Sequence, residues 1–281
     1  MKNKVVVITG STRGFGYCIA EAMLKAGATV IISGRSEEAL EEAIKSLSSL
    51  GPLTGRLCDV REEKQVYALA RQVVEHFGRI DVWINNAGYS ASAGWMLETP
   101  PVQAIDMFFA NDMGSLYGSQ AALHFMLARK EGTLVNIYGQ GSFLNPATPT
   151  GLYGATKAWL ASFTRSLAKE VKGSGVKILA FSPGMMMTDM LAAPTVIGER
   201  GRQMMKNYAF VLRFLAIPPS RAAERLVRVL GSNRKEFLEY RMLKPWSPFL
   251  GLLRVAWENL TRTGMRPEYE IHFEDAYHPE I

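Results

Sequence analysis

A tyrosine and a lysine four residues apart could exchange a proton with an oxygen atom of a substrate. Tyr153 and Lys157 stand in the stretch Tyr-Gly-Ala-Thr-Lys, inside a segment that is typical of a helix through Ala168. Positions four apart lie on one helix face, so the Lys157 ammonium is expected near the Tyr153 phenol. A nearby cation should lower the pKa of a tyrosine below its ordinary value of about 10, which would help it exchange protons. Taken alone, the pair also fits a solvated helix face.

A glycine-rich turn follows the first strand that the sequence predicts. Residues 4–9 are a β-branched run, typical of a strand buried on both faces. An amphipathic helix over residues 17–26 follows the turn. Strand, glycine turn and helix form the context of a dinucleotide site, where a pyrophosphate approaches the backbone at the helix N-terminus. The turn consists of Gly10, Ser11, Thr12, Arg13, Gly14, Phe15 and Gly16.

The end of the second predicted strand, residues 29–33, indicates which dinucleotide would bind. An acidic residue just after this strand would bind the adenosine ribose hydroxyls of NAD, and the sequence has none there. Arg35 stands in that place, and Arg13 in the glycine turn is a second cation. Because the planar guanidinium suits a phosphate, the pattern predicts NADP(H) rather than NAD. The alternative is that Arg35 and Arg13 are ordinary surface arginines that bind no phosphate.

Strands and helices alternate along the rest of the chain. Further strands are predicted at 55–58, 81–84, 133–137, 176–181 and 236–240. Helices are predicted at 37–50, 62–77 and 221–230, with a longer one at 102–129 that is interrupted near Asn111. Such alternation predicts βαβ units, a parallel sheet and an α/β fold.

These motifs together resemble the short-chain dehydrogenase/reductase family over about residues 4–189. The resemblance implies one Rossmann-like domain with a doubly wound, seven-stranded parallel sheet and helices on both faces. It also implies hydride transfer between NADP(H) and a carbonyl or an alcohol. The matching motifs are Thr9-Gly10-x-x-x-Gly14-x-Gly16, Asp59-Val60, Asn85-Asn86-Ala87-Gly88, Asn111, Tyr153-x-x-x-Lys157 and Pro183-Gly184-x-x-x-Thr188.

The same resemblance implies a role for each matching residue. Tyr153 would be the general acid/base, Lys157 would hold the nicotinamide ribose and tune Tyr153, and Asn111 would hold a proton-relay water. The remaining motif residues would contact the cofactor: Asp59 and Val60 at the adenine, Asn86, Ala87 and Gly88 on the adenosine and ribose side, and Thr188, after Pro183 and Gly184, at the carboxamide.

One motif departs from the family pattern. The family usually has a serine about thirteen residues before the tyrosine, where its hydroxyl bonds the substrate oxygen. Counting back from Tyr153 gives Gln140, and counting forward from the strand gives Gly139. Ser142 lies slightly further on, and a longer loop would bring its hydroxyl to the same place. We therefore predict Ser142 as the donor, with the Gln140 amide as the alternative.

A narrower resemblance concerns the substrate. Asn136-Ile137-x-Gly139-x-Gly141-Ser142 and the segment Ser182–Leu191 are similar to the chlorophyll b reductase group. This implies reduction of a formyl group on a chlorin ring, within the broader class of large lipophilic aldehydes and ketones. Two alternatives stay open: a reductase of steroid, retinoid or fatty-acyl carbonyls, and a non-catalytic NADP(H)-binding sensor or partner-binding protein.

Composition limits the other classes of function. The net charge is +6 and no basic run carries interleaved aromatics, so nucleic acid is not an expected partner. The four histidines lack metal-ligand spacing, and no metal is predicted. The chain shows no signal or transit peptide and no run that would span a bilayer, so a cytoplasmic location is expected. The family resemblance implies a homodimer or homotetramer.

The C-terminal third is expected to shape the substrate site. We predict one domain over residues 1–240, with a substrate lid near 185–218 that is rich in methionine, and a C-terminal helix and polar tail over 241–281. Apolar residues recur at helical spacing from Trp246 to Leu260. This stripe either packs on the domain or a second subunit, or touches a membrane surface as a peripheral contact.

Overall fold

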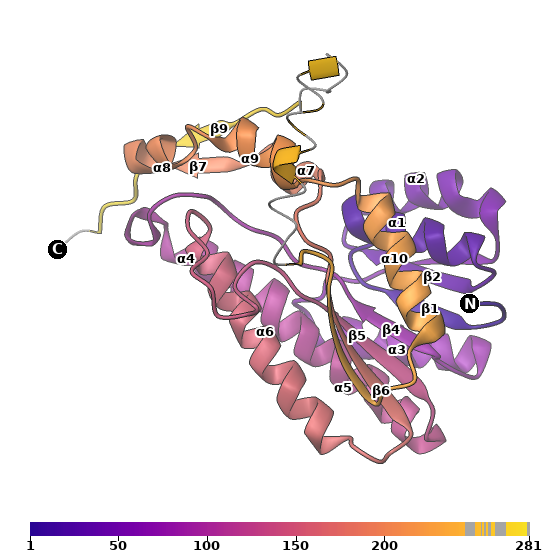
Figure 1. The fold of residues 1–281 in the computed structure, drawn as a ribbon. Coiled ribbons are helices and arrows are strands. Elements are labelled where there is room, and N and C mark those ends of the chain that lie inside the picture. Colours follow the sequence, from indigo (N-terminus) through magenta and orange to yellow (C-terminus); the bar gives the residue numbers. More distant parts are fainter. Residues whose placement is uncertain (245–250, 254, 256, 258–259, 262–267, 280–281) are drawn as a thin grey trace.

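The computed structural model describes residues 1–244, 251–253, 255, 257, 260–261 and 268–279. Seven parallel strands form one sheet in the order β3-β2-β1-β4-β5-β6-β8, and helices cover both of its faces (Figure 1). The predicted fold class is therefore confirmed. The strands are β1 Val5–Ile8, β2 Thr29–Gly34, β3 Leu53–Leu57, β4 Val82–Asn85, β5 Gly132–Ile137, β6 Val176–Ser182 and β8 Phe237–Arg241.

Side chains of successive strand residues point to opposite faces, and this alternation separates two cores. Val6 and Ile8 of β1 pack with one set of helices, and Val5 and Val7 pack with the other. The first face is covered by α1 (Gly14–Lys25), α2 (Glu37–Leu47) and α10 (Pro219–Ser232). The second face is covered by α3 (Glu63–Phe77), α5 (Gly114–Arg129) and α6 (Gly151–Glu170).

The strand order reverses at β1, which pairs with β2 on one side and β4 on the other. Connections leave this point in opposite directions, so a crevice opens at the carboxyl ends of these strands, where ligands of such sheets bind. The glycine turn and the Asn85–Gly88 segment both emerge here. The sheet thus brings two of the sequence motifs to one place.

The long helix predicted over residues 102–129 is divided in three. It comprises α4 (Pro101–Phe108), a π-helical turn η3 (Phe109–Met113) and α5. The interruption near Asn111 is confirmed. Single π-helical turns widen a helix locally and often occur at functional sites.

The lid region contains a second sheet that the sequence did not predict. β7 (Thr195–Ile197) pairs in parallel with β9 (His272–Glu274), which belongs to the polar tail. Main-chain bonds from Glu270 N to Ala192 O at 2.7 Å and from His272 N to Pro194 O at 3.0 Å extend the pairing. Figure 1 shows β9 beside β7, near the short lid helices. These are α7 (Asp189–Ala192), α8 (Gly198–Met204) and α9 (Tyr208–Leu215).

Part of the predicted apolar stripe can be located. Val255 is buried, whereas Leu253, Trp257 and Leu260 are exposed. Trp246, Phe249 and Leu250 lie outside the described residues. Among the helices that the structure describes, none is both long and apolar enough to cross a membrane.

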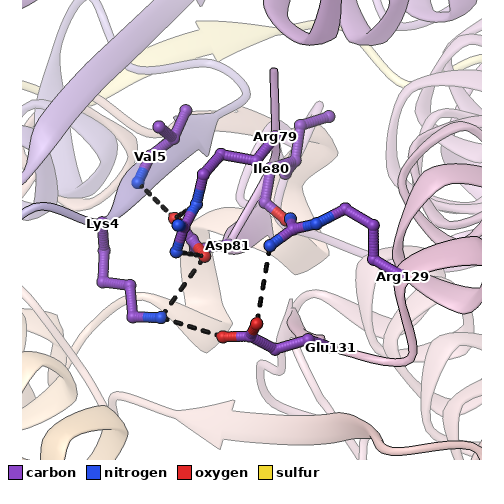
Figure 2. A network of polar contacts seen from close by, with 7 residues as sticks. All are labelled: Lys4, Val5, Arg79, Ile80, Asp81, Arg129 and Glu131. Atoms are coloured by element: carbon purple, nitrogen blue, oxygen red, sulfur yellow. Dashed lines mark hydrogen bonds and ion pairs between the residues drawn. The ribbon is translucent and has the colours of Figure 1, made fainter. Parts of the chain in front are cut away.

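A charged cluster lies at the amino ends of β1, β4 and β5, whereas the crevice is at their carboxyl ends. Figure 2 shows this cluster, which ties the three strands together. Asp81, just before β4, accepts hydrogen bonds from Val5 N at 2.8 Å and Arg79 Nε at 2.7 Å, and Lys4 pairs with it at 3.4 Å. Lys4 also pairs with Glu131 at 3.0 Å, just before β5. Burial acts to raise the pKa of Asp81, but the bonds from Arg79 and Val5 outweigh it and hold the pKa below its ordinary value.

Candidate active site

The glycines of the turn allow it to pack closely against the β4 end. Gly10 has φ +60, and a methyl group built there would lie 2.8 Å from Ala87 Cα. A methyl group on Gly16 would lie 2.5 Å from Asn86 Nδ2. Gly14, the first residue of α1, has φ +58, a conformation that favours glycine. Larger residues would displace the backbone that lines the crevice.

Hydrogen bonds hold the turn against the β4 end. The Asn86 amide donates to Thr9 O at 3.0 Å and Gly10 O at 2.9 Å. The Thr9 hydroxyl accepts from Asn86 N and Ala87 N, each at 3.1 Å. The Asn86 side chain therefore shapes the turn instead of facing outward.

Three further residues of the turn pack against the protein. The buried Ser11 hydroxyl donates to Ile8 O at 2.7 Å and accepts from Ser33 N at 2.9 Å, which joins the ends of β1 and β2. Phe15 belongs to the core on the first face of the sheet. Thr12 packs against the end of β2, since a methyl group on Gly34 would lie 2.6 Å from its Cγ2.

The N-terminus of α1 fits a negatively charged group. Its first turn has no acidic residue, and Arg13 at the N-cap makes no side-chain capping bond. Uncapped amide groups and the helix dipole favour an anion at this point. The residues present therefore fit the pyrophosphate of a dinucleotide.

Three arginines stand in the loops that follow β1, β2 and β3. Arg35 is exposed directly after β2. Arg13 pairs with Asp189 of the lid at 3.5 Å, and both of these side chains are mostly exposed. Arg61, which the sequence analysis did not single out, donates to Asp59 Oδ2 from Nη2 at 2.7 Å. Its place two residues after Asp59 was the only signal that could have indicated it.

The Asp59-Val60 pair forms a fixed edge of the crevice. Hydrogen bonds from Arg61 hold the pKa of Asp59 below its ordinary value, with a contribution from the charge of Arg35. Val60 is buried against the start of α5, where a methyl group on Gly114 would lie 2.9 Å from Val60 Cβ. A direct contact of either residue with adenine stays a prediction.

Tyr153, Lys157 and Asn111 converge beside this crevice. The Lys157 ammonium lies 5.6 Å from the Tyr153 ring centroid and donates to Ile137 O at 3.1 Å. A methyl group on Gly88 would lie 2.7 Å from Asn111 Oδ1 and 3.8 Å from Lys157 Nζ. The structure thus brings together the three side chains that the sequence placed on two separate helices.

The Asn111 side chain fixes the π-helical turn. Its amide donates to Tyr89 O and to Thr156 Oγ1, each at 3.0 Å, and its oxygen accepts from Tyr89 N at 2.9 Å. These bonds use the groups that we expected to hold a relay water. That role of Asn111 stays a prediction.

The expected direction of the tyrosine pKa is wrong for this structure. Burial raises the pKa of Tyr153 to about 12, and Lys157 does not lower it. The i,i+4 spacing places both residues on one helix face, but the ammonium turns to Ile137 O instead of the phenol oxygen. Burial also lowers the pKa of Lys157 to about 8, although the negative charge of Asp112 acts in the opposite direction.

The loop after β5 is packed tightly on α6. Ser142 is fully buried, and its hydroxyl donates to Lys157 O at 3.1 Å and accepts from Gly139 N at 3.2 Å. A methyl group on Gly139 would overlap the Tyr153 hydroxyl and lie 3.0 Å from its Cζ. Gln140 is exposed. Of the two predicted donors, Ser142 is thus engaged with the main chain and Gln140 is open to solvent.

The lid begins opposite the glycine turn. A methyl group on Gly14 would lie 3.9 Å from Thr188 Cβ, so Thr188 faces the start of α1 across the crevice. Gly184, after Pro183, has φ +84 and packs on Leu243. The start of the lid therefore lies close to the glycine turn, and contacts of Thr188 and the other motif residues with a cofactor stay predictions.

Comparison with known proteins identifies the family. The short chain dehydrogenase family model matches residues 4–195. An uncharacterized oxidoreductase of Staphylococcus epidermidis is 33% identical over 220 residues, which cover 78% of this chain and 94% of the relative. Chlorophyll(ide) b reductase NOL, chloroplastic, of Arabidopsis thaliana is 36% identical over 229 residues, covering 79% of this chain and 64% of that protein.

Solved structures agree with these relatives. A short-chain dehydrogenase from Streptomyces avermitilis superposes with a TM-score of 0.74 at 28% identity, covering 93% of this chain and 98% of that one. Actinorhodin polyketide ketoreductase with NADPH gives a TM-score of 0.73 at 26% identity, covering 86% and 98%. The motifs, the strand order and these matches together show that the chain belongs to the short-chain dehydrogenase/reductase family of oxidoreductases.

Proposed function

We propose that this protein is an NADPH-dependent reductase of an aldehyde or ketone on a large lipophilic substrate. The observation that carries the proposal is the convergence of Tyr153, Lys157 and Asn111 beside a glycine turn that fits a pyrophosphate. This combination supports a proton donor beside the bound cofactor.

The protonation states of the site favour reduction. NADPH, when bound, would supply the hydride for the carbonyl carbon. A Tyr153 hydroxyl with a pKa of about 12 keeps its proton at neutral pH and can donate it to the carbonyl oxygen. Lys157, with a pKa of about 8, is mostly protonated at pH 7 and would donate to the nicotinamide ribose of the bound cofactor.

The cofactor preference rests on charge. Arg35 and Arg13 stand at the end of β2 and in the glycine turn, where the 2′-phosphate of NADP(H) would lie. Gly34 and Ser36, on either side of Arg35, offer no carboxylate for the ribose hydroxyls of NAD. The similar polyketide ketoreductase is bound to NADPH, which supports the same preference here.

The donor to the carbonyl oxygen stays a choice between two residues. Ser142 could donate only by exchanging its bond to Lys157 O for one to the substrate. Gln140 is exposed and could donate through its amide without breaking that bond. A site in which neither donates would favour the NADP(H)-binding sensor as the alternative function.

We propose that the substrate is large and apolar. The more specific candidate is a chlorophyll b-type pigment, whose formyl group would be reduced. The similar chlorophyll(ide) b reductase supports it. Met185 and Met187 at the start of the lid are half-buried, and Met190 and Met204 are 37% and 39% exposed. Flexible thioethers of this kind adapt to bulky apolar ligands.

The test is to incubate pure protein with NADPH or NADH and a panel of carbonyl compounds. The panel contains a chlorophyll b-type pigment, a steroid ketone, retinal and a fatty aldehyde, and absorbance reports cofactor oxidation. We expect NADPH oxidation with at least one lipophilic carbonyl and conversion of the formyl group where the pigment reacts. Tight NADPH binding without oxidation of any compound would support the sensor.

We also propose that the C-terminal apolar residues make a peripheral contact with a membrane. Leu253, Trp257 and Leu260 are 53%, 65% and 79% exposed, and such side chains can enter a membrane interface where lipophilic substrates reside. Sedimentation with lipid vesicles tests it, with Trp257→Glu and Leu260→Glu as variants that should abolish association. If the variants sediment with vesicles as much as the wild type does, this contact is excluded. A separate sedimentation experiment without vesicles reports whether the protein is a dimer or a tetramer.

A further inference from the structure

The carboxyl group of Asp112 lies inside the protein without a hydrogen-bond partner. The residue is 0% exposed, and neither carboxyl oxygen has a partner among the residues that the structure describes. An unpaired carboxylate in the protein interior is strongly disfavoured, so such a group needs a compensating charge or a proton. The proposed reaction does not use Asp112.

Asp112 is held next to the reaction site by its neighbour in the chain. It follows Asn111 in the π-helical turn η3, which packs on α6 through the bond from Asn111 to Thr156 at 3.0 Å. Thr156 directly precedes Lys157. A methyl group built on Gly88 would lie near both Asn111 Oδ1 and Lys157 Nζ, at the distances given above. The turn that carries Asp112 therefore lies against the segment that carries Lys157.

The buried side chains of Asp112 and Lys157 carry opposite charges, and each stabilises the charged form of the other. Lys157 is 5% exposed, and among the described residues its ammonium donates to one neutral acceptor, Ile137 O. Burial raises the pKa of Asp112 to about 7, and the charge of Lys157 acts to lower it. In turn, Asp112 acts to raise the pKa of Lys157 against the effect of burial. Each group thus changes the protonation of the other near neutral pH.

The other charged groups on the neighbouring elements pair elsewhere. On α4, Asp106 pairs with Arg61 at 3.7 Å, and Arg61 also binds Asp59. The Tyr153 hydroxyl on α6 keeps its proton at neutral pH because burial raises its pKa to about 12. Lys157 is therefore the charged group that acts on Asp112.

We propose that Asp112 is a positioning residue that balances the charge of Lys157 and so keeps the ammonium protonated for cofactor binding. The inference rests on the proposed function for its consequence in the reaction. The interaction itself can be measured without any cofactor.

The first experiment follows the charge of Lys157 directly. The ε-carbon resonances of lysines labelled with carbon-13 are titrated in the wild type and in Asp112→Asn, and Lys157→Arg assigns the signal. We expect the substitution to lower the pKa of Lys157 by about one pH unit, because a neutral amide replaces the opposing charge. The matched control is Asp106→Asn, since Asp106 is a carboxylate of the preceding helix whose side chain is 52% exposed. An unchanged pKa of Lys157 in Asp112→Asn would overturn the proposal.

The second experiment measures the dissociation constant of NADPH by fluorescence at two pH values. In Asp112→Asn we expect the constant to rise about threefold to tenfold near pH 8 and to change little near pH 6, where Lys157 is protonated in either protein. A purely structural role would weaken binding equally at both pH values, which would overturn the proposal. If Asp112→Asn does not fold, Asp112→Leu removes the same charge. Failure of every protein to bind NADPH would refute the proposed function, while the lysine titration would still decide this inference.

Discussion

The Ser142 hydroxyl donates a hydrogen bond to the main-chain oxygen of Lys157 at 3.1 Å. The same hydroxyl accepts from Gly139 N at 3.2 Å, so one side chain ties the loop after β5 to the helix that carries Tyr153 and Lys157. A hydroxyl has one proton to donate, and here it is already used. Ser142 therefore supports the geometry of the site in this structure, whether or not it also reaches the substrate.

For Ser142→Ala we expect a loss of stability, because Gly139 N and Lys157 O both lose their bond to the Ser142 hydroxyl. The free energy of unfolding should fall by about 1–3 kcal/mol, measured by denaturant titration. Gln140→Ala is the matched comparison and should leave stability unchanged, since Gln140 is exposed. Turnover of both variants then identifies the donor to the carbonyl oxygen. A rate loss of about 10²–10³ in Ser142→Ala with unchanged stability would show that the serine acts on the substrate itself.

Tyr153→Phe keeps the ring and removes the proposed acid. We expect NADPH to bind as before while turnover falls by about 10²–10⁴, the usual contribution of a positioned proton donor. Tyr67→Phe is the control, because the Tyr67 hydroxyl bonds Gln120 on the surface at 2.8 Å, away from the site. Near-normal turnover of Tyr153→Phe would contradict the proposed chemistry.

Arg35→Asp should reverse the cofactor preference from NADPH toward NADH. The lost phosphate contact should cost about 1.5–3 kcal/mol, roughly tenfold to a hundredfold in NADPH affinity. Arg234→Asp makes the same change of charge on an exposed arginine far from the crevice and should leave the preference unchanged. The ratio of the two dissociation constants is the measurement. A constant ratio in Arg35→Asp would mean that Arg35 does not contact the cofactor.

Much of the fold was predictable because its signals are local. The β-branched run before Gly10 and the glycines after it define a strand and a turn within a few residues, and Asn111 marks an interruption of helical periodicity. The strand β9 had no such signal. His272–Glu274 is three exposed residues long, and it is a strand because β7, far back in the sequence, supplies its partner.

The details of the site depend on tertiary contacts that spacing does not contain. The i,i+4 relation of Tyr153 and Lys157 predicts a shared helix face, but not that Lys157 is buried or that its ammonium turns to Ile137 O. The direction of the Tyr153 pKa was wrong for this reason. In the same way, the sequence gives the position of Ser142 in the loop but not the direction of its hydroxyl.

Gly139→Ala tests why the family serine is missing from this loop. A side chain at this position would overlap the Tyr153 hydroxyl, so either the loop or the tyrosine must move. We expect the free energy of unfolding to fall by about 1–3 kcal/mol and turnover to fall at least tenfold. In Gly231→Ala, the control on α10, the added methyl meets nothing within 4 Å and should do no harm. Unchanged turnover of Gly139→Ala would show that the loop adapts and can accept a serine there.

The charged cluster of Figure 2 should determine stability without affecting catalysis, because it lies at the opposite end of the sheet from the crevice. Asp81→Asn removes a buried carboxylate that bonds Val5 N and Arg79. We expect it to lower the free energy of unfolding by about 1–3 kcal/mol at neutral pH and to leave NADPH binding intact.

The pH dependence of that loss makes the prediction specific to the charge of Asp81. The folded-state pKa lies below the unfolded value of about 3.9, so the carboxylate stabilises the protein fully above that pH. Its contribution disappears as the pH falls through the folded-state pKa, and the wild type and Asp81→Asn should then become equally stable. Glu131→Gln is the control, because Glu131 is 56% exposed in the same cluster and its pairs should contribute about 1 kcal/mol at most. Denaturant titrations from neutral to acid pH measure the difference. A loss in Asp81→Asn that stays constant down to the acid limit would assign the effect to packing instead of charge.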